Sequence, residues 1–321
     1  MIRRLFILLA AACAASPATG LAQAYPSQPI RFIVPFTPGT GIDIIARSVG
    51  QRLSERIGQA VVVENRAGAS GNIGTELAAK AKPDGYTVLV TVSTFVANRP
   101  LFKNVPYDPV KDFAPITLSA WGSLLIVAHP STGFSTVPEL VAAAKASPGK
   151  LNYGSPGVGT PHHISMELFK NVTGVAVVHV PYKGTAGAVT DLLGGQINLM
   201  FLPIHVALPH VRAGKLKALA VSSPQRSGLA PDVPTLSETG IQGVEVDMWY
   251  AFFAPHGTPK EVIARLNSEM RAILGTPEIR ASFLAQGLEP TASTPEEVRS
   301  LVEKDLVKWE RVVREAKISP E

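Results

Sequence analysis

The sequence lacks most of the features that mark other classes of protein. Its one cysteine, Cys13, leaves no pair for a disulfide within the chain. Lysine and arginine are scattered without a basic run, so nucleic acid and anionic membranes are not expected partners. No P-loop and no Gly-x-Ser-x-Gly elbow occurs, and the glycines in residues 154–159 have the wrong spacing for a dinucleotide site. We therefore expect no cofactor.

The first 24 residues have the order of a secretory signal peptide. Arginines at 3–4 precede an apolar run over residues 5–15, and residues 22–24, Ala-Gln-Ala, form a small-x-small cleavage site. We predict cleavage after Ala24 and a periplasmic location; a retained membrane anchor and a lipoprotein cut before Cys13 are the alternatives. The run is shorter than the ~20 residues that span a bilayer, and no later apolar stretch reaches that length. Cleavage lowers Lys+Arg from 30 to 28 against 25 acids, a net charge of about +3.

After residue 24, apolar β-rich runs alternate with helical patterns. This alternation predicts two domains with parallel sheets and helices on both faces. In the first half we expect strands at 30–36, 61–64 and 87–92 and helices at 42–57 and 74–81. In the second half we expect strands at 124–128, 151–154, 177–180, 197–201 and 216–221, and helices at 137–146, 162–172, 186–193 and 204–213.

The C-terminal part is nearly all helical. Residues 258–261 (Thr-Pro-Lys-Glu) and 294–297 (Thr-Pro-Glu-Glu) each predict a capping box at a helix start. We expect these helices to pack back on the first lobe, with residues 114–128 crossing outward and residues 244–254 returning. Two crossings make a hinge. The predicted lobe one is 25–124 plus 248–321, and lobe two is 125–247.

Three loops rich in small residues follow predicted strands and open predicted helices. They are residues 36–43, 154–163 and 180–187. In α/β sheets ligands bind beyond the carboxyl ends of strands, and the first turn of a helix offers unpaired N–H groups that favour an anion. The first two loops contain no Lys or Arg, so we expect a carboxylate held by main-chain amides and hydroxyls.

The titratable residues in these loops have structural explanations as well. Asp43 lies four residues before Arg47, at ion-pair spacing, and we expect it to organise the loop; receiving a ligand ammonium is the alternative. His162 and His163 point about 100° apart on a helix and lack a third ligand, so we expect no metal site. Trp249 and Tyr250 could equally line the cleft or belong to the core.

Further short motifs occur in a fixed order along the chain: residues 34–43 with Ala46-Arg47, 62–66, 68–74, 83–86, 107–109, 111–113, 154–163, 180–184, 191–196, 231–235, 253–255 and 257–259. In this order and spacing the sequence resembles the substrate-binding receptors of tripartite tricarboxylate transporters, also called Bug receptors. The resemblance spans essentially the whole chain after residue 24. One departure is Gly39-Thr40-Gly41, where the family often has two adjacent glycines, so an extra hydroxyl enters the first loop.

The resemblance implies a type II periplasmic-binding-protein (Venus flytrap) fold, with two doubly wound lobes and a two-strand hinge. It implies a monomeric receptor, without catalytic residues, that captures a small carboxylate: an amino acid, a di- or tricarboxylate, or an aromatic carboxylate. The receptor would deliver this ligand to membrane permease subunits. The ligand-binding positions expected from the loops and the resemblance are Phe36, Thr37, Pro38, Gly39, Thr40, Gly41, Asp43, Ser93, Thr94, Ser155, Val158, Gly159, Thr160, His163, Tyr182, Lys183, Gly184, Thr185, Ala186, Phe201 and Pro203.

Two other functions stay open from the sequence. A sensory subunit would present the same ligand to a membrane signalling partner, and the sequence does not separate it from a transport receptor. An enzyme would use Asp43, His162 or His163 on a bound carboxylate, but no base–nucleophile pairing is visible from the spacing.

Overall fold

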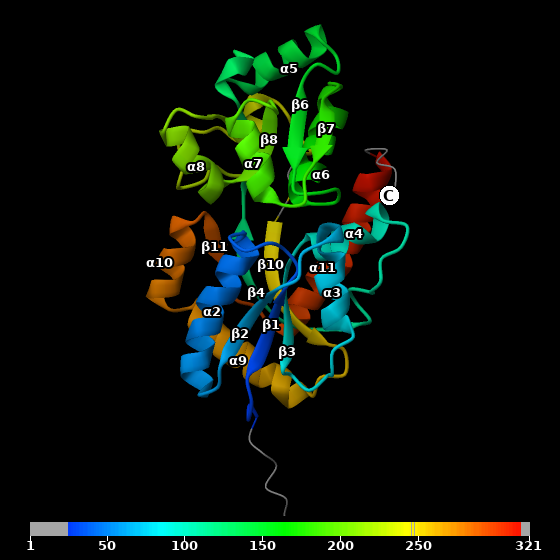
Figure 1. Cartoon of the computed structure of the whole chain (residues 1–321), viewed down its shortest axis with the longest axis vertical. Helices are drawn as coiled ribbons and strands as arrows, with labels where there is room; N and C mark the ends of the chain where they lie inside the picture. Colours follow the sequence, from blue (N-terminus) through cyan, green and yellow to red (C-terminus); the bar gives the residue numbers. More distant parts are fainter. Residues whose placement is uncertain (1–24, 245, 247, 316–321) are drawn as a thin grey trace, which may run out of the picture.

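Two α/β lobes lie one above the other along the long axis of the molecule (Figure 1). The computed structural model describes residues 25–244, 246 and 248–315, so the predicted signal peptide and its cleavage site lie outside the described residues. Within these ranges no helix combines the length and the apolar character needed to cross a membrane.

Lobe one is built on a six-stranded sheet. Its elements are β1 (Ile30–Val34), α2 (Gly41–Ile57), β2 (Val61–Asn65), η2 (Ala69–Gly71), α3 (Asn72–Ala79), β3 (Thr87–Val92), α4 (Thr94–Leu101), β4 (Phe113–Gly122), β10 (Met248–Pro255), α9 (Lys260–Leu274), α10 (Pro277–Ala285), β11 (Leu288–Pro290) and α11 (Pro295–Glu315). The strands are ordered β11-β4-β10-β3-β1-β2.

Lobe two is built on a five-stranded sheet. Its elements are β5 (Leu124–Ala128), η3 (Pro130–Thr132), α5 (Val137–Ala146), β6 (Asn152–Ser155), α6 (Pro161–Thr173), β7 (Val178–Pro181), α7 (Thr185–Leu193), β8 (Leu199–Pro203), α8 (Ile204–Arg212), β9 (Lys217–Val221) and η4 (Ser237–Thr239). The strands are ordered β7-β6-β8-β5-β9.

The two-lobed α/β fold is confirmed, but the prediction of purely parallel sheets is wrong. β1 is parallel to β2 and β3, and β6 is parallel to β7 and β8. By contrast, β10 is antiparallel to β3 and β4, and β5 is antiparallel to β8 and β9. The reason is the path of the chain: β4 leads out of lobe one and β10 leads back into it, so the two neighbours run in opposite directions.

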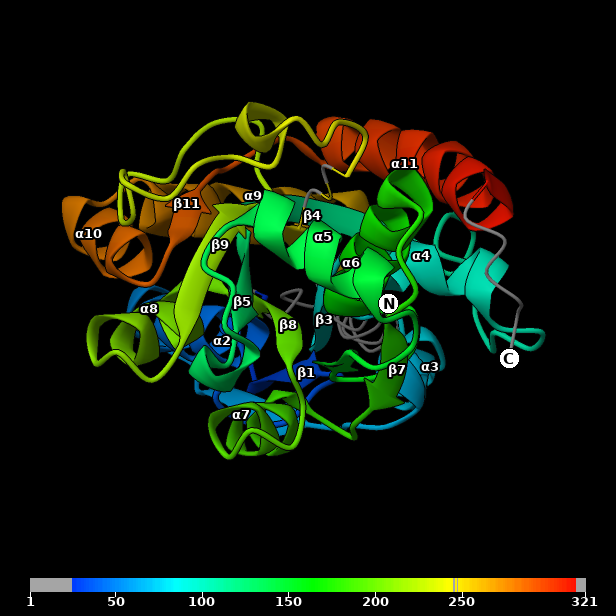
Figure 2. The ribbon, with the colours of Figure 1, turned by 90° about the horizontal axis from the view of Figure 1, so that it is seen from above.

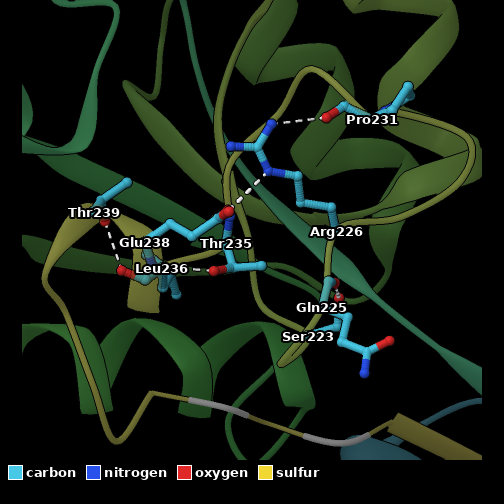
Figure 3. A network of polar contacts seen from close by, with 8 residues as sticks. All are labelled: Ser223, Gln225, Arg226, Pro231, Thr235, Leu236, Glu238 and Thr239. Carbon is cyan, nitrogen blue, oxygen red and sulfur yellow. Dashed lines mark hydrogen bonds and ion pairs between the residues drawn. The ribbon is translucent and has the colours of Figure 1, made fainter.

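The chain passes between the sheets twice. The first passage is at Ser123, between β4 and β5, and the second is the segment that leads from β9 to β10. A polar network holds the second segment in shape (Figure 3): Arg226 Nε donates to Glu238 at 2.9 Å, Arg226 Nη1 donates to the Pro231 carbonyl, and the Thr235 amide donates to Glu238 at 2.7 Å. The predicted domain boundaries at 124/125 and 247/248 stay predictions.

The core of lobe one is centred on β10. All eight residues of this strand are buried, because β3 and β4 cover its edges and helices cover its faces. Trp249 Nε1 donates to Asp305 Oδ2 of α11 at 2.6 Å, which fixes the last helix to the central strand. Seen from above, α9, α10 and α11 lie along one side of the molecule (Figure 2). Because α9 and α11 pack against β4, the C-terminal helices return to lobe one as expected.

The two predicted capping boxes have different outcomes. At α11 the box is confirmed, since the Glu297 amide donates to Thr294 Oγ1 and the Thr294 amide donates to the Glu297 carboxylate. At α9 the prediction is wrong: the helix begins at Lys260 after Pro259, and Thr258 Oγ1 donates to the Pro255 carbonyl instead. Thr258 closes the turn that leaves β10 and lies one residue before the N-cap position, which Pro259 occupies, so it is displaced from the capping position.

Candidate functional site

A cavity lies between the two lobes. It contains about 520 Å³ of space not filled by protein, with the solvent at its mouth included. Lobe one contributes Phe36, Gly39, Thr40, Gly41, Ile42, Val92, Thr94, Met248 and Tyr250, and lobe two contributes Pro156, Thr160, Pro161, His162, Thr185, Pro203, His205 and Val206. Residues from both lobes therefore line one cavity.

Five helices begin at this cavity, namely α2 and α4 from lobe one and α6, α7 and α8 from lobe two. In none of these five helices does the side chain of the N-cap residue accept a hydrogen bond from the first turn. Helices α3 and α9 also lack such a cap, whereas α5 and α10 are each capped by a threonine side chain. Uncapped first turns leave N–H groups free, and the helix dipoles place partial positive charge at the same points. The cavity therefore favours an anion.

The described lining of the cavity is made of uncharged side chains and main-chain atoms. Among the described residues that line the cavity, none is Asp, Glu, Lys or Arg. An anion there would be held by main-chain N–H groups and neutral side chains, which is the arrangement predicted from the lysine- and arginine-free loops.

The loop before α2 is held by a charged network. Asp43 is buried and accepts from the Gly39 amide at 3.0 Å, from Arg47 at 3.0 Å and from Asn65 Nδ2 at 3.0 Å. Burial alone would raise the pKa of Asp43, but the hydrogen bonds from Arg47, Gly39 and Asn65 outweigh it, so this pKa lies below its usual range. Thr40 Oγ1 donates to the Thr37 carbonyl at 3.1 Å and closes the turn.

The loop before α6 has the same shape but a neutral network. Thr160 Oγ1 donates to the Gly157 carbonyl at 2.7 Å, and the Gly159 amide donates to His163 Nδ1 at 3.3 Å. Ser155 Oγ lies 2.7 Å from His179 Nε2 of β7. Burial, and secondarily the neighbouring His179, lowers the pKa of His163 to about 4, so its ring is neutral and can accept at neutral pH.

The lobes touch around the cavity. Ser70 Oγ, in lobe one, donates to the Val158 carbonyl in lobe two at 2.6 Å. A side chain placed on Gly159 would lie 2.9 Å from Asn98 Oδ1 across the same border. Asn98 is itself fixed, since its amide group donates to the Ser70 carbonyl and to Asn72 Oδ1. The structure is therefore that of a closed cleft.

Several buried polar atoms at the cavity have no hydrogen-bond partner in the described part of the chain. They include both ring nitrogens of His162, Thr94 Oγ1 and His205 Nε2. Burial and the neighbouring His205 lower the pKa of His162 to about 3, so its ring is neutral. Such atoms cost free energy unless something pairs with them, which indicates a ligand that carries polar groups.

Eight of the predicted positions line the cavity: Phe36, Gly39, Thr40, Gly41, Thr94, Thr160, Thr185 and Pro203. The other predicted positions do not line it, and direct ligand contact by them stays a prediction: Thr37, Pro38, Asp43, Ser93, Ser155, Val158, Gly159, His163, Tyr182, Lys183, Gly184, Ala186 and Phe201.

Many of the positions outside the lining support the loops instead. Asp43 and His163 accept from loop amides, as described above, and Tyr182 Oη donates to Asp191 at 2.6 Å. Phe201 is fully buried in the core of lobe two. A side chain on Gly184 would lie 3.2 Å from Thr37 Oγ1, so these two residues face each other where the lobes meet.

The sequence did not predict several lining residues, above all Val92, His205, Val206 and Met248. His205 and Val206 begin α8 directly after a strand, so the rule that found the other loops could have found this one. Met248 and Val92 belong to strands, and only the tertiary structure shows that their ends reach the cavity. Tyr250, open between cleft and core in the sequence, is buried and also lines the cavity.

Comparisons with known proteins agree with this architecture. The sequence model of the family described as "Tripartite tricarboxylate transporter family receptor" matches residues 45–318. Protein BugT of Bordetella pertussis is 37% identical over 311 residues, covering 96% of this chain and 95% of BugT. A UPF0065 protein from the tcbD-tcbE intergenic region of Pseudomonas sp. (strain P51) is 36% identical over 297 residues, covering 92% of this chain and 88% of that protein.

Solved structures give the same result. The structure described as R. palustris Rpa4515 with adipate has a TM-score of 0.89 and 35% identity, covering 92% of this chain and all of that one. The periplasmic binding protein BugD has a TM-score of 0.87 and 34% identity with the same coverage. MatC from Rhodopseudomonas palustris, with bound malate, has a TM-score of 0.85 and 30% identity, covering 90% of this chain and all of MatC.

Proposed function

This chain belongs to the tripartite tricarboxylate transporter family of receptors, and on that premise we propose that it captures a small carboxylate in the periplasm and releases it, unchanged, to membrane permease subunits. One observation carries the proposal. Five uncapped helix starts from two lobes converge on one cavity whose described lining has no charged side chain. The adipate and malate in two related structures support a carboxylate as the ligand class.

The mechanism follows from the two loops. In an open form, the carboxylate meets the first turn of α2, whose loop is already fixed by Asp43 within its own lobe. Closure brings the first turns of α6, α7 and α8 to the same group. Each lobe then interacts with the ligand, so binding free energy favours the closed state over the open one.

The test is thermal unfolding of the chain with a broad panel of carboxylates, each paired with its methyl ester or primary amide. A ligand that binds the folded state alone raises the melting temperature in proportion to its concentration over Kd. We expect at least one carboxylate to raise it and its uncharged partner not to. If no carboxylate in the panel does so, the receptor proposal fails.

A matched pair of variants locates the binding in the cavity. A side chain on Gly41 would lie 2.7 Å from the Tyr250 hydroxyl, so Gly41→Val should abolish the ligand-induced rise. Gly228→Val places the same side chain in open space in the segment between β9 and β10 and should leave the rise intact. Unfolding of each variant without ligand shows whether it is folded.

Transport and catalysis are distinguished by the fate of the ligand. After incubation with the protein, the bound carboxylate should be recovered unaltered by mass spectrometry. Detergent-solubilised permease subunits should be retained on the immobilised, ligand-loaded protein and less on the ligand-free protein. Retention of a sensor kinase instead would favour the sensory alternative.

A further inference from the structure

The lobes meet at a second place, between the start of α8 in lobe two and the turn from α10 to β11 in lobe one. A side chain on Gly287, in this turn, would overlap Cγ2 of Ile204, the first residue of α8. Figures 1 and 2 show α8 and α10 at one end of the molecule and α6 and α3 at the other. The Gly287 contact and the hydrogen bond from Ser70 to Val158 therefore join the lobes toward opposite ends of the molecule.

His205 connects this second contact to the cavity. It follows Ile204 in α8 and lines the cavity. Its ring hydrogen-bonds to the main chain of Gln286, the residue before Gly287. The Gln286 amide already donates to the Phe283 carbonyl, so in the bond with His205 the ring N–H donates and the Gln286 carbonyl accepts. One side chain of the cavity lining therefore holds the opposite lobe directly.

The other ring nitrogen of His205 is left to accept. Nε2 is buried and has no partner in the described part of the chain, which assigns the bond with Gln286 to Nδ1. Burial lowers the pKa of His205 to about 4, although the bond to Gln286 raises it, so the ring is neutral at pH 7. A neutral imidazole that carries its hydrogen on Nδ1 has a lone pair on Nε2. A buried acceptor without a donor costs free energy, so the ring favours a hydroxyl or N–H group beside it.

We propose that His205 binds the ligand and couples it to closure: Nε2 accepts a hydrogen bond from a hydroxyl or N–H group of the bound carboxylate, while Nδ1–H holds the Gln286 carbonyl of lobe one. The ligand class is then the hydroxy and amino carboxylates, with one carboxylate group or several. This inference rests on the proposed function, because it presumes that a carboxylate occupies the cavity.

The first test compares carboxylates that share a carbon skeleton and differ in one donor group. The series are succinate, malate and aspartate; glutarate, 2-hydroxyglutarate and glutamate; and benzoate, 4-hydroxybenzoate and 4-aminobenzoate. In at least one series, titration calorimetry at neutral pH should show the hydroxy or amino member binding about fivefold or more tighter than the parent acid, the worth of one net hydrogen bond. A parent acid that binds at least as tightly as both analogues in every series would overturn the inference.

Two variants of His205 separate its two hydrogen bonds. His205→Asn keeps an N–H donor close to the position of Nδ1 and removes Nε2, so it should abolish the advantage of the hydroxy or amino member and leave the affinity of the parent acid unchanged. His205→Phe removes both bonds and should also weaken the parent acid, by about fivefold. His256→Asn, at an exposed position outside the cavity, is the control. Equal losses for parent and analogue in His205→Asn would mean that Nε2 does not contact the ligand, and the inference would be wrong.

A rescue experiment tests the contact between the lobes. Gly287→Ala sets a methyl group against Ile204 and should weaken binding of the tightest member of the three series by about tenfold or more. Adding Ile204→Ala removes the overlapping methyl group and should restore most of the affinity. Gly214→Ala is the matched control, because Gly214 has the same φ of 69° and a side chain there would meet nothing within 4 Å. Unfolding without ligand shows whether each variant is folded, and a Gly287→Ala variant that binds like Gly214→Ala would overturn the coupling to closure.

Failure of this inference and failure of the proposed function give different results. If every carboxylate of the broad panel that raises the melting temperature lacks a hydroxyl or N–H group, this inference is overturned and the receptor function stands. If no carboxylate of any kind binds, the proposed function fails and this inference falls with it.

Discussion

The loop before α2 in lobe one and the loop before α6 in lobe two place a glycine, a threonine and a hydrogen-bond acceptor at the same spacing. Gly39 and Gly159 both have positive φ, at 82° and 79°, and each donates its amide to a side chain four residues later. In lobe one that acceptor is the carboxylate of Asp43, and in lobe two it is the neutral ring of His163. The same backbone shape is therefore stabilised by a charged network in one lobe and by a neutral one in the other.

The two loops also differ in what surrounds them. Around Gly39 there is open space, because a side chain there would meet nothing within 4 Å. Gly159 lies against Asn98 and Leu101 of the opposite lobe. At these two glycines the contact between the lobes therefore falls on the loop of lobe two: Gly159 packs against lobe one, whereas Gly39 meets nothing of lobe two.

Acidification should separate the two loops most strongly. The folded-state pKa of His163 is about 4 against 6.5 for an unperturbed histidine, so the unfolded chain binds a proton at a pH where the folded chain does not. Stability therefore falls as the pH is lowered from about 6.5 to about 4, by on the order of 3 kcal/mol from this residue. Asp43, whose pKa lies below its usual range, should not contribute in that window.

Denaturant unfolding at several pH values between 7 and 4 measures how the free energy of unfolding changes with pH. His163→Asn offers an oxygen acceptor without titrating, so its stability should decline less steeply than that of the wild-type chain. His162, His179 and His205 keep their own lowered pKa values and leave a residual slope in both proteins. Asp43→Asn should leave the slope in this window as it is. A His163→Asn variant as acid-sensitive as the wild type contradicts the comparison.

Adding one methyl group to each equivalent glycine should have the next largest effect. Alanine at either position adopts a left-handed conformation that costs about 1–2 kcal/mol. Gly159→Ala also brings its methyl group to within 2.9 Å of Asn98 Oδ1 when the lobes close. We expect ligand affinity to fall about tenfold or more further in Gly159→Ala than in Gly39→Ala, as measured by calorimetry. Equal losses would mean that loop two does not form the closing contact.

The smallest effect is expected at Ser70. Ser70→Ala removes the hydroxyl that donates to the Val158 carbonyl, a hydrogen bond worth about 1 kcal/mol, or roughly fivefold in affinity. Ser70 has a positive φ of 52°, so Ser70→Gly loses the same hydrogen bond but relieves backbone strain. Both variants should bind more weakly, and Ser70→Gly should be the more stable of the two. Wild-type affinity in both would show that this contact does not favour closure.

The elements that local pattern determines could be predicted well. The helix over residues 137–146 was predicted at its observed bounds, because Thr136 caps it and Pro138 lies in its first turn. The short helix α4 was missed, because Pro100 lies inside it. Tertiary packing accounts for this helix: Phe95 contacts the rings of Tyr107, Phe113 and Phe253. Strand direction across the hinge was also missed, because it depends on the path of the whole chain.

The candidate site likewise has one part that local sequence pattern predicts and one part that depends on the tertiary structure. The loops before α2 and α6 could be predicted, since small residues after a buried strand and before a helix are a local signal. The rest of the lining could not, because His205 and Met248 line one cavity only when two lobes with separate sheets come together. Ser70 gave no signal either, as its role depends on a carbonyl 88 positions further along the chain.

In the function we propose, the carboxylate is held by peptide N–H groups, which every residue except proline supplies. Mutation can therefore exchange most side chains of the cavity lining without touching the groups that hold the carboxylate. In a gene lineage this would let the preferred nutrient change by single substitutions while uptake of some acid is retained throughout. Sequence divergence among such receptors should accordingly concentrate at positions such as Val92, Val206 and Met248, and spare the glycines of the two loops.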